Sequence, residues 1–228
     1  LQANDTSKLG LAGMFASMMN EDTKNYTAEQ MTVELQKLGS NVSVSSSFDG
    51  ITFSVQTLKK NLDATLTLLQ ERMFSPKFTD AAFSRIQKQR LQGFKQAKAD
   101  PASVANLVFA KLNYGPNSIL GMSEDGTEHT IGNLKLQDVE DYYANYMTSQ
   151  GVKVVVVGDI KQQEMLPKLA FLARLPNKKI KLPEVNAQAS NVDKTKVYLV
   201  DIPKAAQSQF RVGYATGLKF DATGDYYK

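Results

Sequence analysis

The side chains best suited to metal or nucleophilic chemistry are scarce in this chain. Its 228 residues include one histidine, His129, and no cysteine. The lack of cysteine excludes a disulfide framework, a thiol nucleophile and every cysteine-based zinc site. His129 follows Glu128 in a polar stretch, where we expect a solvated side chain. A single imidazole cannot build a zinc site from neutral nitrogen and sulfur ligands.

Hydroxyl groups are concentrated in one short segment that contains Ser43, Ser45, Ser46 and Ser47. A nucleophilic serine needs an adjacent base, and no histidine lies nearby in the sequence. A hydrolase based on serine or carboxylate chemistry would need Asp49 or Asp125, the acids near candidate loops, to lie close to a nucleophile. We therefore interpret these serines as the polar surface of a strand.

Charge and hydrophobicity exclude two classes of partner. The chain carries 27 basic and 23 acidic residues, a net charge of +4. The excess is spread along the sequence and lacks the dense Lys/Arg clusters of nucleic-acid-binding proteins. No apolar run approaches the roughly 20 residues that a membrane span requires. We expect neither a nucleic-acid partner nor a membrane span.

The elements that would position these residues follow from periodicity and capping residues. Thr27 as N-cap and Gly39 just past the C-terminus mark one helix, and Asp49-Gly50 is typical of a hairpin turn. Met14, Phe15, Met18 and Met19 are expected in the core. The predicted helices span 9–20, 27–38, 58–74, 80–99, 102–112, 136–146, 162–172 and a segment from 221, with strands at 41–48, 50–57, 152–157, 197–202 and 209–215 and a surface loop at 114–133. This predicts an α+β fold, an antiparallel sheet with helices packed on it.

A change in composition predicts a domain boundary. Residues 174–196 contain Pro176, Pro183, several lysines and few apolar residues, as an extended linker does. We expect one domain over 1–173, with its first strands upstream of Leu1, and the truncated start of a second, similar domain over 197–228.

The order of these elements resembles the α/β roll of the pitrilysin/insulinase family of zinc peptidases. Gly10-Leu11-Ala12 is similar to the family's G-L-A-H start, and the stretch from Leu38-Gly39 to Asp49 is similar to its L-G-G-x-x-N-A-x-T-S-x-D strand. Later landmarks follow in order: Ser75-Pro76-Lys77-Phe78, Asp100-Pro101, Tyr114-Gly115 and Val155-Val156-Val157-Gly158-Asp159. The resemblance covers roughly residues 7 to 160 and predicts the same roll, with 197–228 opening its next repeat.

The zinc-binding residues of that family are missing. Active members carry H-x-x-E-H on the first helix, two zinc ligands and the general base. The corresponding residues are Gly13, Ala16 and Ser17, which can neither bind zinc nor accept a proton. The family's third ligand is a glutamate on the long helix, but residues 87–97 contain no acid. We therefore expect no catalysis and no metal or other cofactor in this chain.

The resemblance implies the role of a degenerate half in a bipartite peptidase. Such halves pair with a zinc-bearing peptidase domain, in the same polypeptide or a neighbouring subunit, and enclose a chamber that holds peptides or unfolded segments. The strand on which active members lay peptide by edge pairing corresponds to Asn41, Val42, Ser43, Val44, Ser45, Ser46 and Ser47. Arg211 and Tyr214 lie too early in the second domain to be the Arg–Tyr pair of bacterial members.

Two alternatives remain at this stage. The same roll also serves as a scaffold in core subunits of the respiratory chain, which predicts a large apolar interface and no peptide binding. A serine or carboxylate hydrolase is the third hypothesis. Family habit suggests export to the periplasm of a bacterium, with the cytoplasm as the alternative.

Overall fold

The structure is a computed structural model that describes residues 6–48, 50–115, 118–180 and 194–214. The chain forms two compact units, one of residues 1–91 with 124–183 and one of residues 92–123 with 184–228. The contact units therefore interleave along the sequence, and each is described by itself. The predicted domains, 1–173 and 197–228 with a linker between them, remain a prediction.

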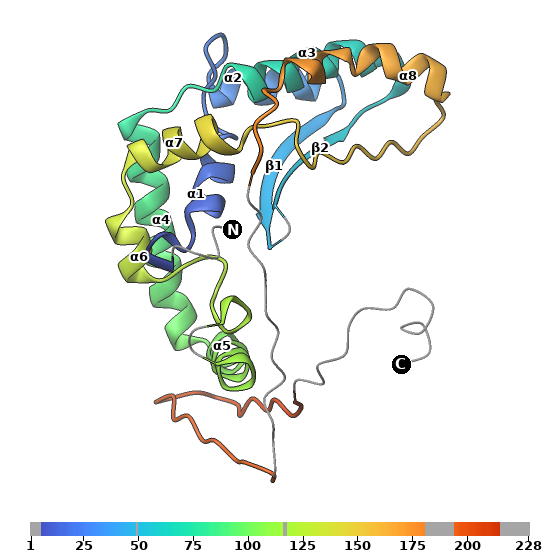
Figure 1. The fold of residues 1–228 in the computed structure, drawn as a ribbon. Coiled ribbons are helices and arrows are strands. Elements are labelled where there is room, and N and C mark those ends of the chain that lie inside the picture. Colours follow the sequence, from blue (N-terminus) through green and yellow to red (C-terminus); the bar gives the residue numbers. More distant parts are fainter. Residues whose placement is uncertain (1–5, 49, 116–117, 181–193, 215–228) are drawn as a thin grey trace. The chain divides into compact units, whose positions relative to one another are not determined.

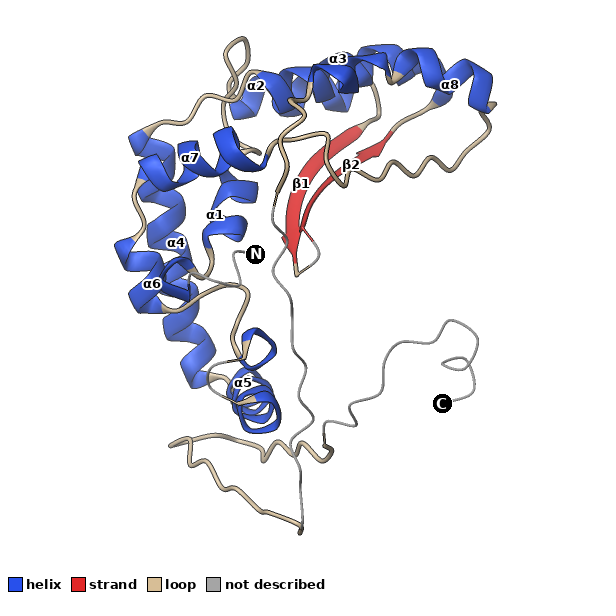
Figure 2. Ribbon diagram, viewed as in Figure 1, coloured by secondary structure: helices blue, strands red, loops and turns tan. Residues whose placement is uncertain are grey.

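The first unit combines helices with one β-hairpin (Figures 1 and 2). Its elements are α1 (Leu11–Met18), α2 (Ala28–Lys37), β1 (Asn41–Ser47), β2 (Gly50–Gln56), α3 (Leu62–Phe74), the first part of α4 (Asp80–Ala99), α6 (Glu128–Asn133), α7 (Leu136–Tyr146) and α8 (Gln162–Lys168), with 3-10 turns at Thr6–Lys8, Lys59–Asn61 and Ala170–Arg174. The second unit contains the end of α4, α5 (Pro101–Tyr114) and a 3-10 turn at Ile119–Gly121. The predicted α+β class is confirmed.

The hairpin presents one apolar face to the helices. β1 and β2 pair antiparallel, with Asn41 opposite Gln56 and Ser47 opposite Gly50. Val42 and Val44 of β1 are buried, whereas Ser45 and Ser47 are exposed. Helices α1, α2 and α3 all contact β1. The alternation of valine and serine in the sequence therefore reflects a half-buried strand.

Helix α1 is the most buried helix of this unit. Met14 and Phe15 are fully buried, and Met18 and Met19 are 1% exposed, as expected. Phe15 packs against Tyr142 of α7, with ring centroids 4.8 Å apart. A second cluster joins α2, β1 and α3 to the region of α8: Met31, Leu35, Val42, Leu66, Leu68, Leu69, Met73, Met165 and Leu175. Full burial of such a side chain contributes about 1.5–3 kcal/mol.

Glycine is required where α1 begins. Gly10, the N-cap of α1, has φ 89°, which only glycine adopts freely. A Cβ on Gly10 would overlap the carbonyl oxygen of Asp125 and the side chain of Ile131. This close approach holds the loop before α6 against the start of α1.

Three predicted strands are wrong. Residues 152–157 and the described parts of 197–202 and 209–215 form no strand, and Val155 and Val157 are 84% and 93% exposed. A strand requires a hydrogen-bonded neighbour, and within the described residues the only sheet is the hairpin. Residues 114–133, predicted as a loop, contain the 3-10 turn Ile119–Gly121 and α6, which a Thr127–Thr130 capping box initiates.

The other predicted elements agree with the structure to within a few residues, except that the helix predicted over 162–172 ends at Lys168 and continues as a 3-10 turn. The Thr27 cap bonds Gln30 as a capping box, and Gly39 has φ 58°. Asp49 of the predicted turn, Ala215 and the helix predicted from residue 221 lie outside the described residues.

Candidate functional site

The three degenerate zinc-motif positions lie on the buried side of α1. Gly13 and Ala16 are buried, and Ser17 is half-buried. The Ser17 hydroxyl donates a hydrogen bond to the Gly13 carbonyl oxygen at 2.9 Å. The last position of the motif is thus tied back to the first within α1.

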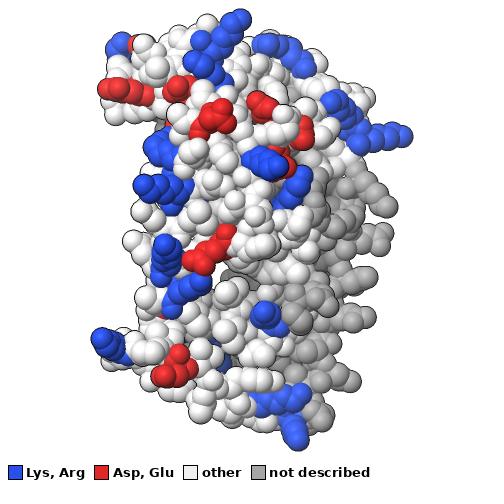
Figure 3. Space-filling model, turned by 90° about the vertical axis from the view of Figure 1, so that its left-hand side faces the viewer, with Lys and Arg blue, Asp and Glu red and all other residues white. Residues whose placement is uncertain are grey.

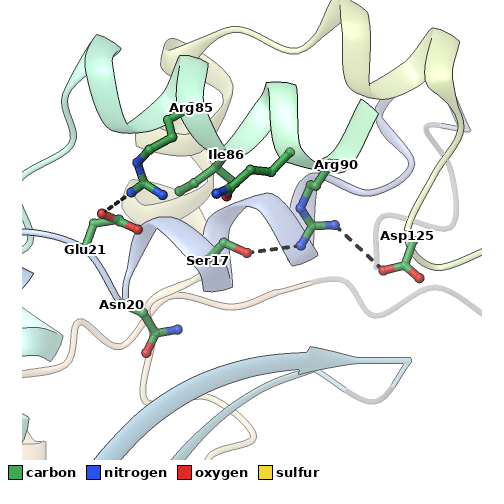
Figure 4. Close-up of a pocket in the computed structure, with 8 residues that line it drawn as sticks. Ser17, Asn20, Glu21, Arg85, Ile86, Arg90 and Asp125 are labelled. Atoms are coloured by element: carbon green, nitrogen blue, oxygen red, sulfur yellow. Dashed lines mark hydrogen bonds and ion pairs between the residues drawn. The ribbon is translucent and has the colours of Figure 1, made fainter. Parts of the chain in front are cut away.

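A side chain from α4 fills the space beside these positions. The Arg90 guanidinium lies so close to Gly13 that a Cβ there would be 2.9 Å from Nη2 and 3.0 Å from Nη1. Nη2 donates a hydrogen bond to Ser17 Oγ at 3.1 Å, and Nη1 lies 3.7 Å from Asp125 Oδ1 (Figure 4). Burial lowers the pKa of Arg90, and the charge of Asp125 opposes that shift. A guanidinium nevertheless stays protonated at neutral pH.

These residues do not fit a zinc ion. Zinc needs imidazole, thiolate or carboxylate ligands, and Gly13, Ala16 and Ser17 offer none. A fixed cation already lies against two of the three positions, and it would repel a divalent metal. Across the part of the chain that the structure describes, no three His, Cys, Asp or Glu side chains are grouped to hold a metal.

Arg90 lies in an open hollow of about 540 Å³. The hollow is lined by residues of α1, the turn after α1, α4 and the loop before α6: Ser17, Asn20, Glu21, Arg85, Ile86, Gln89, Arg90 and Asp125. Figure 4 shows Arg90 pointing toward Ser17 and Asp125, and Arg85 pointing toward Glu21. Arg85 Nη2 and Glu21 Oε2 are 2.5 Å apart. The lining therefore carries two positive and two negative side chains.

Asn20, in the turn after α1, and Arg72 of α3 bond the outer edge of β1. The Asn20 amide donates to the carbonyl oxygens of Ala16 and Val44, both at 2.8 Å, and its Oδ1 accepts from the Val44 N–H at 3.0 Å. Arg72 Nη1 donates to Asn20 Oδ1 at 2.9 Å and to the Val42 carbonyl oxygen at 2.6 Å. Arg72 is 5% exposed, and among the residues that the structure describes its Nε has no hydrogen-bond partner. Burial lowers its pKa, and nearby Glu21 opposes that shift.

This arrangement narrows the surface on which a peptide could pair with β1. Because strand residues alternate in direction, the outward backbone groups belong to Val42, Val44 and Ser46. Asn20 and Arg72 already bond Val44 and the Val42 carbonyl. The predicted peptide-binding strand, Asn41–Ser47, is untested, and its outer edge is left for pairing mainly near Ser46.

Arg90, Asn20 and Arg72 were missed by the sequence reasoning. A signal existed for Arg90, because it follows the buried residues Phe83 and Ile86 at spacings of seven and four and so shares their face of α4. Asn20 and Arg72 gave no comparable signal, because their partners on β1 lie 24 or more residues away in the sequence.

The other singled-out residues lie apart from this hollow, except Asp125. His129 is exposed at the start of α6, with its Nε2 3.1 Å from Asn133 Nδ2. In the second unit, Arg211 donates a hydrogen bond to Asn106 at 2.6 Å. On the face drawn in Figure 3, basic and acidic side chains are interspersed. None of the helices in the described residues is both long and apolar enough to cross a membrane.

The curated relatives include a non-peptidase homolog, zinc proteases and a subunit of a respiratory-chain complex. The chain is 30% identical over 166 residues to the non-peptidase homolog YmxG of Helicobacter pylori, covering 73% of this chain and 38% of that protein. It is 22% identical over 165 residues to subunit 1 of the mitochondrial cytochrome b-c1 complex of Rattus norvegicus, covering 71% and 34%. The chain thus spans less than two fifths of the length of either relative.

Solved structures share the fold. A peptidase M16 inactive domain from Pseudomonas fluorescens matches with a TM-score of 0.73 and 22% identity, over 82% of this chain and 47% of that chain. The periplasmic protease PqqL from Escherichia coli matches with a TM-score of 0.62 and 14% identity, over 82% and 20%. The family model for insulinase, peptidase family M16, matches residues 2–115, and the model for the peptidase M16 inactive domain matches residues 133–227. The chain therefore belongs to the M16 (insulinase) peptidase family, as its resemblance to that family implied.

Proposed function

We propose that this chain is a non-catalytic peptidase-like domain that pairs with a zinc-bearing M16 domain and helps to enclose a chamber that holds peptide. The partner would be part of the same polypeptide or a neighbouring subunit, and it would supply the zinc. The observation that supports this proposal is the position of Arg90 against Gly13 and Ser17. Its guanidinium fills the space that metal ligands would need, and its positive charge would repel a metal ion.

Two surfaces of the first unit are candidates for holding peptide. The outer edge of β1 near Ser46 offers backbone groups for strand pairing, which gives affinity with little dependence on sequence. The hollow around Arg90 offers charged side chains beside the apolar Ile86. Within the described residues, both belong to the same compact unit.

A purely structural scaffold is the second candidate function. The contacts of Asn20 and Arg72 favour it, because they occupy the edge of β1 at Val42 and Val44 and leave little of that edge for peptide. The similarity to subunit 1 of the cytochrome b-c1 complex points the same way. A scaffold would bind no peptide and would bury a large apolar interface with its partner.

Zinc content and peptide cleavage, measured together, test the proposal. The purified chain is incubated with saturating zinc and quenched fluorescent peptides, first alone and then with a zinc-bearing M16 partner. We expect no stoichiometric zinc and no cleavage from the chain alone, and cleavage that appears or rises with the partner. A partner whose motif glutamate is changed to glutamine is the matched control and should give no cleavage.

The possible outcomes separate the hypotheses. Stoichiometric zinc together with cleavage by the chain alone would refute the non-catalytic assignment. If the chain neither cleaves peptide alone nor changes the cleavage by a competent partner, the result would favour the scaffold.

We also propose export to the periplasm, the compartment named for the E. coli structural neighbour. Fractionation of cells that express the full-length protein with a C-terminal tag tests this location. A signal confined to the cytoplasmic fraction would contradict it.

A further inference from the structure

The hollow beside α1 has features of a binding site. Its volume of about 540 Å³ lies within the range of small-molecule sites, although it is open and lined mostly by polar and charged side chains. Charged side chains converge on it from the turn after α1, from α4 and from the loop before α6 (Figure 4). All of its lining residues belong to the first compact unit, so the hollow is a property of that unit alone.

Arg90 is the side chain that is best placed to bind a ligand here. Its guanidinium is held from one side by Gly13 and Ser17, and its side chain remains 21% exposed toward the hollow. These contacts fix the orientation of the guanidinium in the absence of a ligand. A guanidinium presents paired N–H donors in a planar fork that matches a carboxylate.

The charges around Arg90 leave room for an incoming carboxylate. Glu21 is engaged by Arg85 at 2.5 Å. Asp125 lies 3.7 Å from Arg90 Nη1, beyond hydrogen-bond distance, and its side chain is 70% exposed. Charge-assisted hydrogen bonds between a guanidinium and a carboxylate are usually about 2.7–2.9 Å long. A ligand carboxylate could therefore approach Arg90 more closely than Asp125 does.

We propose that this hollow binds a carboxylate group of a peptide on the Arg90 guanidinium, at the place where the family's zinc motif is lost. The carboxylate is either the C-terminus of the peptide or an Asp or Glu side chain. The proposal rests on the proposed peptide-holding function and names the chemical group that the chain would recognise. Ile86 supplies an apolar wall for the adjacent part of the peptide.

Binding of matched peptides to the full chain tests this proposal. Three fluorescein-labelled peptides share one neutral sequence of ten residues: one ends in a free acid, one in an amide, and one is an amide with a single internal glutamate. Fluorescence anisotropy at low salt should show that at least one carboxylate-bearing peptide binds about tenfold more tightly than the plain amide. Preference for the free acid identifies the C-terminus, and preference for the glutamate peptide identifies an acidic side chain.

Variants locate the carboxylate on Arg90. Arg90→Gln should abolish the tenfold preference, whereas Arg90→Lys should keep part of it, because the charge remains but the fork is lost. Lys88→Gln is the matched control, since it removes the same charge from an exposed position on the same helix and should leave the preference unchanged. Circular dichroism establishes that each variant is folded.

A second variant keeps the test decisive if Arg90→Gln fails to fold. Asp125→Asn removes the competing negative charge from an exposed side chain and should increase the preference for the carboxylate peptide several-fold. A preference that neither Arg90→Gln nor Asp125→Asn alters would overturn the proposal.

The outcome also separates this proposal from the peptide-holding function. Equal binding of all three peptides would overturn the role of Arg90 and leave peptide holding intact. Failure of all three to bind would overturn both.

Discussion

Replacing Asn20 with alanine should weaken the first unit by about 3–4 kcal/mol. Asn20 hydrogen-bonds both the N–H and the carbonyl oxygen of buried Val44, and it accepts a hydrogen bond from buried Arg72. Its removal leaves three buried groups without this partner, and each such loss costs about 1–3 kcal/mol, so the low end of that range gives the estimate. Arg72 Nη1 keeps its hydrogen bond to the Val42 carbonyl oxygen, so the two backbone groups of Val44 contribute most of the loss.

Urea unfolding followed by circular dichroism measures this change in free energy. Asn25→Ala is the matched control, because Asn25 also hydrogen-bonds a side chain, Glu71, but at an exposed site. That control should cost less than about 1 kcal/mol. In the double variant Asn20→Ala with Arg72→Met, the total loss should be smaller than the sum of the single losses, because the buried charge goes with its partner. A loss for Asn20→Ala no larger than that for Asn25→Ala would refute this account of the edge of β1.

Three further predictions follow from single contacts. A variant with the family motif grafted as Gly13→His, Ala16→Glu and Ser17→His should bind no stoichiometric zinc, measured by atomic absorption, while Arg90 is present. Adding Arg90→Glu to this variant should increase its zinc affinity at least about tenfold. Equal zinc affinities with and without Arg90→Glu would contradict the blocking role of Arg90. Gly10→Ala should cost about 2–4 kcal/mol in urea unfolding, because of its positive φ and the carbonyl of Asp125, whereas Gly93→Ala, with open space in α4, should stabilise by about 0.5–1 kcal/mol. Burial raises the pKa of Tyr142 from 10.0 to about 12, so the stability that the neutral hydroxyl contributes is complete below pH 10 and is lost as the pH rises toward 12. Between pH 9 and pH 11, the free energy of unfolding of Tyr142→Phe should therefore fall by about 1.4 kcal/mol less than that of the wild type. An equal fall in both proteins would argue against this effect of burial.

Local signals made most helices and the hairpin predictable. The Thr27 cap with Gln30, Gly39 at a positive φ, and Pro101 after the Asp100 cap each act within a few residues of the element that they bound. The alternation of buried valines and exposed serines in β1 is equally local.

The prediction of a strand over residues 152–157 was wrong because strand pairing depends on contacts that are not local in the sequence. The run of valines in this segment is typical of a buried strand, but pairing depends on a neighbour far away in the sequence. In the described part of the chain this segment has no paired neighbour, and its side chains are largely exposed. Apolar composition alone could not decide whether such a neighbour would be in contact.

The same distinction applies to the site. Gly13, Ala16 and Ser17 could be recognised as degenerate from the sequence, because a motif is local and a missing histidine is visible. The group that replaces the metal could not be recognised, since Arg90 lies 73 residues beyond Ser17 and meets it only in the folded unit. The structure links two of these positions: Gly13 has no side chain, and the Arg90 guanidinium lies where a Cβ on Gly13 would be 2.9 Å from Nη2 and 3.0 Å from Nη1. A side chain at Gly13 would require the end of the Arg90 side chain to move. The degenerate positions are therefore packed against an arginine, and this arginine is the group to which the proposed peptide carboxylate would bind.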